Sequence, residues 1–212
     1  MIIMGVEKIR NIIFDLGGVL IDIDSNRCTH RFEELGLNTA HEFLQSSEFK
    51  TVWYRFEKGD IDATEFRSFI RSKNEVLEDV SNEQIDFAWN GMLLGIPRYK
   101  LDLLLELRTR YVVYLLSNTN SIHWEWALKN PFRYKGFRAE DFFEQEYLSF
   151  RLNACKPEKA IFERVLLEAN LEPKETLFID DRPDNTESAK QLGIITYTPQ
   201  PNEDWSFLFA NE

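Results

Sequence analysis

The stretch Ile12-Ile13-Phe14-Asp15-Leu16-Gly17-Gly18 joins a short apolar run to an abrupt polar end. Such a run of β-branched and aromatic residues, stopping at an acid and two glycines, is typical of a buried strand that enters a turn. Three later runs have the same character and span 111–116, 176–179 and 194–197. Near-continuous apolar strands of this kind indicate a parallel sheet that is covered on both faces.

Helical patterns separate the later strands. Apolar residues recur at helical spacing in 101–107, 161–169 and 189–192, each just before one of the predicted strands. Alternating helices and strands predict an α/β protein with a Rossmann-like parallel sheet as its core.

Residues 25–95 interrupt this alternation, because they contain helical patterns and no convincing strand. We therefore predict a small helical domain, 25–95, inserted into a core made of 1–24 and 96–212. Large apolar side chains recur through the insert: Phe43, Trp53, Phe56, Phe66, Phe69, Ile70, Phe87 and Trp89. They are expected to form the insert's own hydrophobic core rather than a surface on which a substrate stacks.

Polar residues follow three of the four predicted strands: Asp15, the pair Ser117-Asn118, and the pair Asp180-Asp181. Ligands of open α/β sheets bind outside the carboxyl ends of the strands, so these side chains are expected to converge. Lys156 precedes a helical pattern and is expected near the same site. Three neighbouring carboxylates repel one another unless they share a cation, and carboxylate ligands favour Mg²⁺.

Mg²⁺ and a lysine side by side predict a phosphate ligand, because both neutralise phosphate oxygens. Ser117 and backbone amides are expected to donate hydrogen bonds to the same oxygens. A carboxylate that is free to attack phosphorus gives a covalent aspartyl-phosphate, and we assign that role to Asp15.

These residues carry a family resemblance. Residues 14–22, Phe-Asp-Leu-Gly-Gly-Val-Leu-Ile-Asp, resemble the first motif of the haloacid dehalogenase superfamily of hydrolases. Residues 116–119 resemble the second motif, Lys156-Pro157 the third and 180–185 the fourth, so the resemblance covers nearly the whole chain. The position of the insert, 25–95, matches the C1 cap of that family.

The resemblance implies a role for each matching position. Asp15 is the nucleophile and a Mg²⁺ ligand, and the backbone carbonyl of Gly17 also meets the metal. Asp180 binds Mg²⁺ directly, whereas Asp181 acts directly or through water. The residues implied to bind phosphate are Ser117, Asn118 and Lys156.

Within the superfamily the sequence resembles the α-D-glucose-1-phosphate phosphatase type. The shared stretches are 14–17, 22–24, 116–120 and 147–149. The implied activity is Mg²⁺-dependent hydrolysis of a small phosphorylated metabolite, specifically a sugar 1-phosphate.

Gly17 departs from the general pattern, because phosphatases of the family usually carry a second aspartate two residues after the nucleophile. That aspartate is the general acid and base, and its loss costs on the order of 10²- to 10⁴-fold when the leaving group is poor. Gly17 therefore favours good leaving groups, such as sugar 1-phosphates, acyl phosphates and aryl phosphates. A surrogate acid from Asp22, Asp24 or the cap is the alternative.

Two other functions are compatible with parts of the sequence. A haloacid dehalogenase also lacks the second aspartate, but it needs no metal and lacks the acid pair seen here as Asp180-Asp181. A phosphate-binding or regulatory module without turnover would keep Mg²⁺ and trap a phosphorylated Asp15. A sugar phosphomutase is disfavoured, since it requires the acid that Gly17 replaces.

The charge balance limits the partners. The 212 residues carry a formal net charge of -11, which repels nucleic acids and anionic membrane surfaces. No apolar stretch approaches 18 residues, and residues 1–8 do not resemble a signal peptide, so we expect a cytoplasmic protein without a membrane partner. The sequence favours no particular oligomeric state.

Several remaining residues receive structural interpretations. The histidines His30, His41 and His123 form no metal-ligand spacing and are expected at the surface or in the cap. Trp124 and Trp126 are expected to pack rather than to stack on substrate, and 205–209 to dock a tail onto the core, with an apolar contact to another subunit as the alternative. Cys28 and Cys155 are expected to be reduced thiols.

Overall fold

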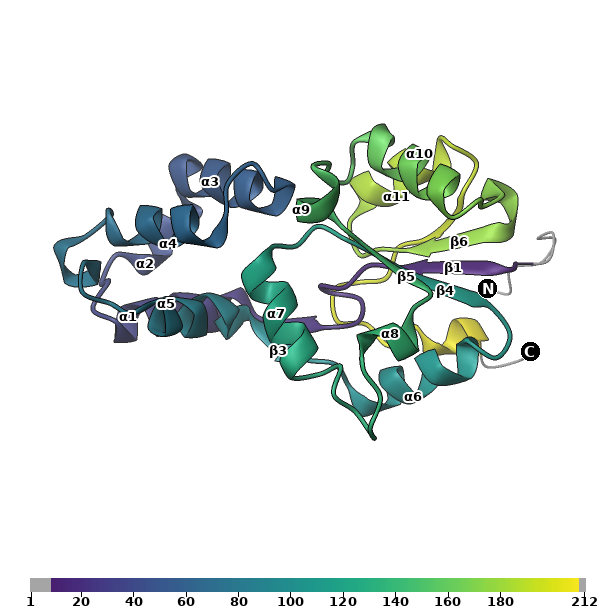
Figure 1. Cartoon of the computed structure of the whole chain (residues 1–212), viewed down its shortest axis with the longest axis horizontal. Helices are drawn as coiled ribbons and strands as arrows, with labels where there is room; N and C mark the ends of the chain where they lie inside the picture. Colours follow the sequence, from purple (N-terminus) through teal and green to yellow (C-terminus); the bar gives the residue numbers. More distant parts are fainter. Residues whose placement is uncertain (1–8, 210–212) are drawn as a thin grey trace.

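The computed structural model describes residues 9–209, and its central element is a five-stranded parallel sheet (Figure 1). The strands are β1 (Asn11–Phe14), β4 (Val112–Ser117), β5 (Gln145–Leu148), β6 (Thr176–Ile179) and β7 (Ile195–Tyr197). Their order is β5-β4-β1-β6-β7, so β1 lies in the middle. Phe14 is in register with Leu115 of β4 and Ile179 of β6. The three strands therefore end at one edge of the sheet, as the α/β prediction requires.

Helices cover both faces of the sheet. One face carries α6 (Arg98–Leu107), α7 (Ser121–Lys129) and α8 (Ala139–Phe142). The other carries α10 (Lys159–Glu168) and α11 (Pro183–Lys190), while α9 (Ser149–Leu152) directly follows β5 (Figure 1). The shorter 3₁₀ turns are η1 (Glu75–Leu77), η2 (Asn90–Met92), η3 (Pro173–Glu175) and η4 (Ser206–Phe209).

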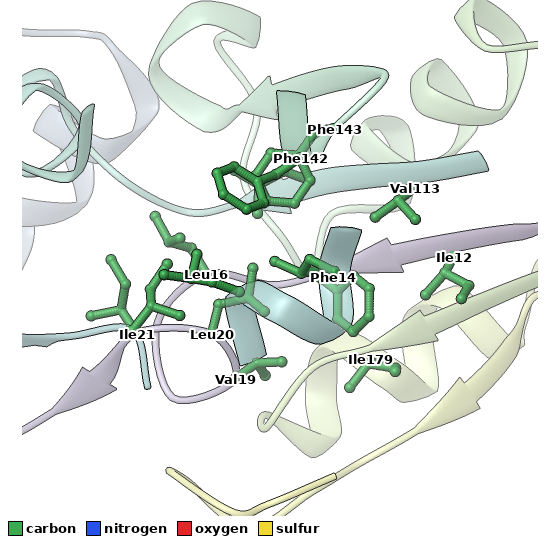
Figure 2. Close-up of a cluster of buried hydrophobic side chains, with 14 of the residues drawn as sticks. Ile12, Phe14, Leu16, Val19, Leu20, Ile21, Val113, Phe142, Phe143 and Ile179 are labelled. Atoms are coloured by element: carbon green, nitrogen blue, oxygen red, sulfur yellow. The ribbon is translucent and has the colours of Figure 1, made fainter. Parts of the chain in front are cut away.

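The central strand β1 is buried on both sides, and its side chains alternate between the two cores. Ile12 and Phe14 belong to the cluster beneath α6 and α8, whereas Ile13 belongs to the cluster beneath α10. Figure 2 shows Phe14 between Ile179 and the paired rings of Phe142 and Phe143. This two-sided burial explains why the strand reads as a continuous apolar run.

The insert extends away from one end of the sheet (Figure 1). Its helices are α1 (Ser25–Glu34), α2 (Ala40–Gln45), α3 (Ser47–Lys58), α4 (Ala63–Arg71) and α5 (Asn82–Trp89). The chain leaves and re-enters the core through two short antiparallel strands, β2 (Asp22–Ile23) and β3 (Leu93–Gly95). The domain boundaries at 25 and 95 stay a prediction, and these strands lie at both junctions.

The expected core of the insert is present, with one exception and one special case. Phe49, Phe56, Phe66 and Trp89 pack together as buried rings. The prediction for Phe87 was wrong, because this ring is 60% exposed, with the Arg31 guanidinium 3.9 Å from its centroid. Trp53 is only partly buried, and it borders the cavity described below.

The 202–209 segment packs against the loop that follows β1. Trp205 is buried, donates from Nε1 to the Val19 carbonyl at 3.0 Å, and lies 4.8 Å from the Phe14 ring. Asn202 accepts from the Ile23 amide at 2.9 Å and donates to its carbonyl at 3.1 Å. The backbone amide of Asn202 also donates to the Gly18 carbonyl at 2.7 Å. These contacts confirm the expected docking of the tail.

Two expectations concern membranes and export. Across residues 9–209, none of the helices combines the length and the apolar character needed to cross a membrane. The interpretation of residues 1–8 lies outside the described residues.

Candidate active site

Lys156 occupies the centre of the predicted site. Its Nζ lies 2.8 Å from Asp15 Oδ1, 2.6 Å from Asp180 Oδ2 and 2.8 Å from the Leu116 carbonyl oxygen. Asp15 follows β1, Asp180 follows β6, and Lys156 lies in the loop before α10. Residues that are far apart in the chain thus meet at one edge of the sheet, as expected from the ends of parallel strands.

Three carboxylates gather at this edge. Asp15, Asp180 and Asp181 each place one oxygen within 4.8 Å of the others. Burial raises the pKa of Asp15 to about 7; Lys156 opposes the rise and the neighbouring Asp180 adds to it. Burial also raises the pKa of Asp181. Burial thus disfavours the ionised form of these carboxyl groups. A hard divalent cation bound between their oxygens would stabilise the ionised form.

Asp180 is held rigidly by its neighbours. Its Oδ1 accepts from the Arg182 amide at 2.8 Å, and the Asn185 amide group donates to both of its oxygens at 3.0 and 2.9 Å. Within the described residues, the buried Oδ1 of Asn185 has no hydrogen-bond partner. This uncharged oxygen is therefore a further candidate metal ligand beside the acids. A set of ligands made of oxygens alone fits Mg²⁺.

The loop after β1 needs Gly18 but leaves room at Gly17. Gly18 has φ +76°, and a Cβ built on it would overlap the Asp181 carboxylate. A Cβ on Gly17 would meet nothing nearer than Ile23, at 3.7 Å. The missing second aspartate of the first motif is thus not explained by crowding.

We expect Gly18→Ala to damage this site. The new methyl group is strained on the left-handed backbone of this position and displaces Asp181, so the free energy of unfolding should fall by about 1–3 kcal/mol and phosphate release by about tenfold or more. Chemical denaturation and a phosphate-release assay measure the two effects. Gly17→Ala is the control for stability, because its Cβ has space. Equal stabilities of the two variants would contradict the interpretation.

Ser117, the last residue of β4, and Asn118, which follows it, make different contacts. Ser117 is buried and its hydroxyl lies near the cavity. The Asn118 side chain accepts from the Lys156 amide and donates to the Lys156 carbonyl, each at 2.8 Å. The amide nitrogen of Asn118 carries a second N–H that these two bonds leave available, so its side chain can still donate to a ligand. The phosphate-binding roles of Ser117, Asn118 and Lys156 stay predictions.

A cavity of about 400 Å³ lies between the insert and the sheet edge. The core contributes Asp15, Gly17, Lys156 and Asp181, among other residues. The residues that the insert and its two connecting strands contribute are Ile23, Ser25, Trp53, Glu57, Met92 and Leu93. The volume is typical of a site for a small molecule.

Sequence reasoning missed Glu57 and Trp53 as cavity residues, and its interpretation of His123 was wrong. His123 is buried on α7 of the core, and its ring stacks on Trp89 at 4.8 Å. Burial lowers the pKa of His123 to about 4, so the ring is neutral at pH 7. His30 and His41 are exposed in the insert, as expected.

Comparison with known proteins gives concordant similarities. A family model described as haloacid dehalogenase-like hydrolase matches residues 9–193. A D-ribitol-5-phosphate phosphatase from Bacteroides thetaiotaomicron is 36% identical over 197 residues, which are 93% of this chain and 95% of that protein.

Solved structures agree closely with the fold. A haloacid dehalogenase (HAD) family enzyme from B. thetaiotaomicron has a TM-score of 0.92 and 49% identity, with 97% of this chain and 100% of that chain covered. The same wild-type enzyme in complex with magnesium and inorganic phosphate has a TM-score of 0.86 at 50% identity, covering 95% and 99% of the two chains. A predicted HAD-like family hydrolase from Porphyromonas gingivalis has a TM-score of 0.85 and 32% identity, covering 97% and 100%.

Proposed function

This chain belongs to the haloacid dehalogenase-like hydrolases, and from that premise we propose that it is a Mg²⁺-dependent phosphatase of small phosphorylated sugars or sugar alcohols. The observation that carries the proposal is the meeting of Asp15 and Lys156, which line a small cavity, with the fully buried Asp180. A nucleophile, a fixed cation and metal-binding acids are the components that phosphoryl transfer needs.

The residues divide the chemistry between them. A carboxylate oxygen of Asp15 attacks phosphorus, the bond to the leaving oxygen breaks, and water later cleaves the aspartyl-phosphate. Lys156 and Ser117 bind the phosphate oxygens. Asp15, Asp180, Asp181 and the Gly17 carbonyl would hold Mg²⁺, which when bound would supply positive charge beside the phosphoryl group. The 50% identical relative was solved in complex with magnesium and inorganic phosphate, which supports a site for these two ligands.

Two observations favour different substrates within this class. Gly17 provides no acid at the usual position and thereby favours sugar 1-phosphates, whose anomeric oxygen leaves more readily than an ordinary alcohol. The 36% identical relative is a D-ribitol-5-phosphate phosphatase, which favours the ester of a primary alcohol. We propose a sugar 1-phosphate as the preferred substrate, with a pentitol 5-phosphate as the second candidate.

The other functions compatible with the sequence have less support. A dehalogenase has no use for the carboxylate cluster of Asp15, Asp180 and Asp181. A binding module without turnover would still bind phosphate and would accumulate phosphorylated Asp15. The proposal includes a cytoplasmic location, supported by Cys28 and Cys155, which are buried free thiols.

Phosphate release in parallel reactions tests the proposal. The substrates are α-D-glucose 1-phosphate, glucose 6-phosphate and D-ribitol 5-phosphate, each with Mg²⁺ or with EDTA. We expect release that requires Mg²⁺ and is fastest with the 1-phosphate. Equal rates for the two glucose phosphates would remove the leaving-group argument and would instead indicate that an acid elsewhere in the site protonates the leaving oxygen. Phosphorylated Asp15 without release from any ester would instead support the binding module.

A further inference from the structure

The proposed phosphatase lacks a proton donor in the loop after β1. Gly17 stands where the family places an acid, and the nearest atom to a Cβ there belongs to Ile23. An alkoxide leaving group departs too slowly without a proton, so another group must deliver it if alkyl phosphates are substrates.

Three carboxyl side chains border the cavity among the described residues. Asp15 is the nucleophile and Asp181 belongs to the metal-binding cluster, which leaves Glu57 without a role. The two other acids that the sequence suggested as substitutes, Asp22 and Asp24, make contacts elsewhere. Asp22 pairs with Lys100 at 3.2 Å, and Asp24 accepts from the Asn26 amide as the N-cap of α1. Glu57 is thus the remaining acid at the site.

We propose that Glu57, on α3 of the insert, is the general acid and base of this enzyme, taking the place of the side chain that Gly17 lacks. This assignment rests on the proposed phosphatase function. It implies that the insert completes the catalytic machinery as well as covering the cavity.

The backbone of Glu57 is tied to the core beside the phosphate site. The Ser149 hydroxyl donates to the Glu57 carbonyl at 2.6 Å and accepts from the Thr119 amide at 3.0 Å. Thr119 follows the Ser117-Asn118 pair, so one buried hydroxyl connects α3 to the end of β4. Through this contact the backbone of Glu57 is fixed relative to the end of β4, where the phosphate site is predicted.

Further contacts hold the end of α3 on the core. Gly59, with φ +79°, approaches the Phe150 carbonyl so closely that a Cβ would overlap it. The Tyr54 hydroxyl donates to Glu158 at 2.7 Å, and Lys58 Nζ lies 3.1 Å from the same carboxylate. Glu158 lies two residues after Lys156, so the helix that carries Glu57 is bound to the loop that carries the central lysine.

The surroundings of Glu57 favour a protonated carboxyl near neutral pH. Burial raises the pKa of Glu57 to about 7, while Trp53, Arg182 and Lys156 oppose the rise. The charged or titratable groups that border the same cavity are Asp15, His123, Lys156, Asp181 and Arg182. A pKa near the working pH suits a group that both gives and takes a proton.

The proton balance closes over the two steps. When Asp15 attacks phosphorus, the bond from phosphorus to the ester oxygen breaks and Glu57 gives its proton to that oxygen. Glu57 is then a carboxylate. In the second step it takes a proton from the water that attacks the phosphorylated Asp15, which returns both side chains to their starting states.

Glu57→Gln tests the assignment through the leaving group. The probes are the alkyl esters D-ribitol 5-phosphate and glucose 6-phosphate, and the aryl ester p-nitrophenyl phosphate, whose phenolate leaves without a proton. We expect kcat/KM for the alkyl esters to fall by about 100-fold or more, and for the aryl ester by less than about fivefold. Glu57→Ala, which introduces no amide, should show the same contrast.

Glu48→Gln is the matched control, because Glu48 lies on the same helix with an exposed side chain that pairs with Lys73. It should change neither rate. The rise in melting temperature on adding Mg²⁺ should be the same in wild type, Glu57→Gln and Glu48→Gln, which shows that the metal site and the fold are intact.

The outcomes separate this inference from the proposed function. Equal losses for alkyl and aryl esters, or no loss for either, would overturn the role of Glu57. A wild-type enzyme that hydrolyses the aryl ester alone would also overturn it, because such an enzyme has no working acid. A wild-type chain that releases phosphate from no ester would contradict the proposed function itself.

Discussion

Asp15→Asn is expected to lower Mg²⁺-dependent phosphate release by about 10⁴-fold or more, because an amide oxygen is a poor nucleophile for phosphorus. The fold should survive, since Asn has the same shape and the change removes a buried carboxyl whose pKa burial raises to about 7. Phosphate release and thermal unfolding, measured on the same preparation, check both statements.

Asp102→Asn is the control for this change. Asp102 is on α6, where its half-exposed side chain pairs with Lys135 at 2.7 Å. It should keep full activity and nearly the same melting temperature. If Asp15→Asn retained more than about one percent of wild-type release, a covalent intermediate on Asp15 would be excluded.

Lys156→Met is expected to impair stability and activity together. Burial disfavours the ammonium form of Lys156, but Asp15 and Asp180 outweigh that effect, so its pKa is raised. Removing the cation leaves two buried carboxylates facing each other without their shared partner. Loss of one member of a buried ion pair typically costs about 3–5 kcal/mol of unfolding free energy.

Activity should fall further than stability alone explains, because the lysine also neutralises the phosphate. A loss of kcat/KM of about 10³-fold is expected for every substrate, since the contact is to phosphate rather than to the leaving group. Denaturant unfolding in EDTA and steady-state kinetics with saturating Mg²⁺ measure the two effects. Lys129→Met is the control, as Lys129 is exposed on α7. An unfolding free energy no lower than that of the control would contradict the role of Lys156 in the core.

The sheet was predictable where its strands are buried on both faces, and less so at its edges. β1, β4 and β6 read as continuous apolar runs because helices cover both sides. β5 was missed, since Gln145 is exposed and Glu146 partly so at the edge of the sheet. β2 and β3 are two and three residues long, too short for a periodic pattern.

The positions of the core site residues followed from topology, whereas those on docked helices did not. Asp15 and Asp180 come directly after strands, and Ser117 is the last residue of one; the ends of these strands must lie together. The place of Glu57 depends on how α3 rests on α9, and that of His123 on how α7 packs against Trp89. The spacing of apolar residues along a helix does not indicate which face of that helix contacts another domain.

The packing of the 202–209 segment bears on how the enzyme is made. Asn202 and Trp205 bond to Ile23 and Val19 across separations of 179 and 186 residues. The ribosome delivers the amino-terminal part first, so a nascent chain already contains Asp15 while the loop around Gly18 still lacks these partners. The catalytic loop is therefore completed only when the segment that reaches residue 209 has emerged from the exit tunnel. We therefore expect a nascent chain that still lacks this segment to be inactive, although most of the sheet can form earlier.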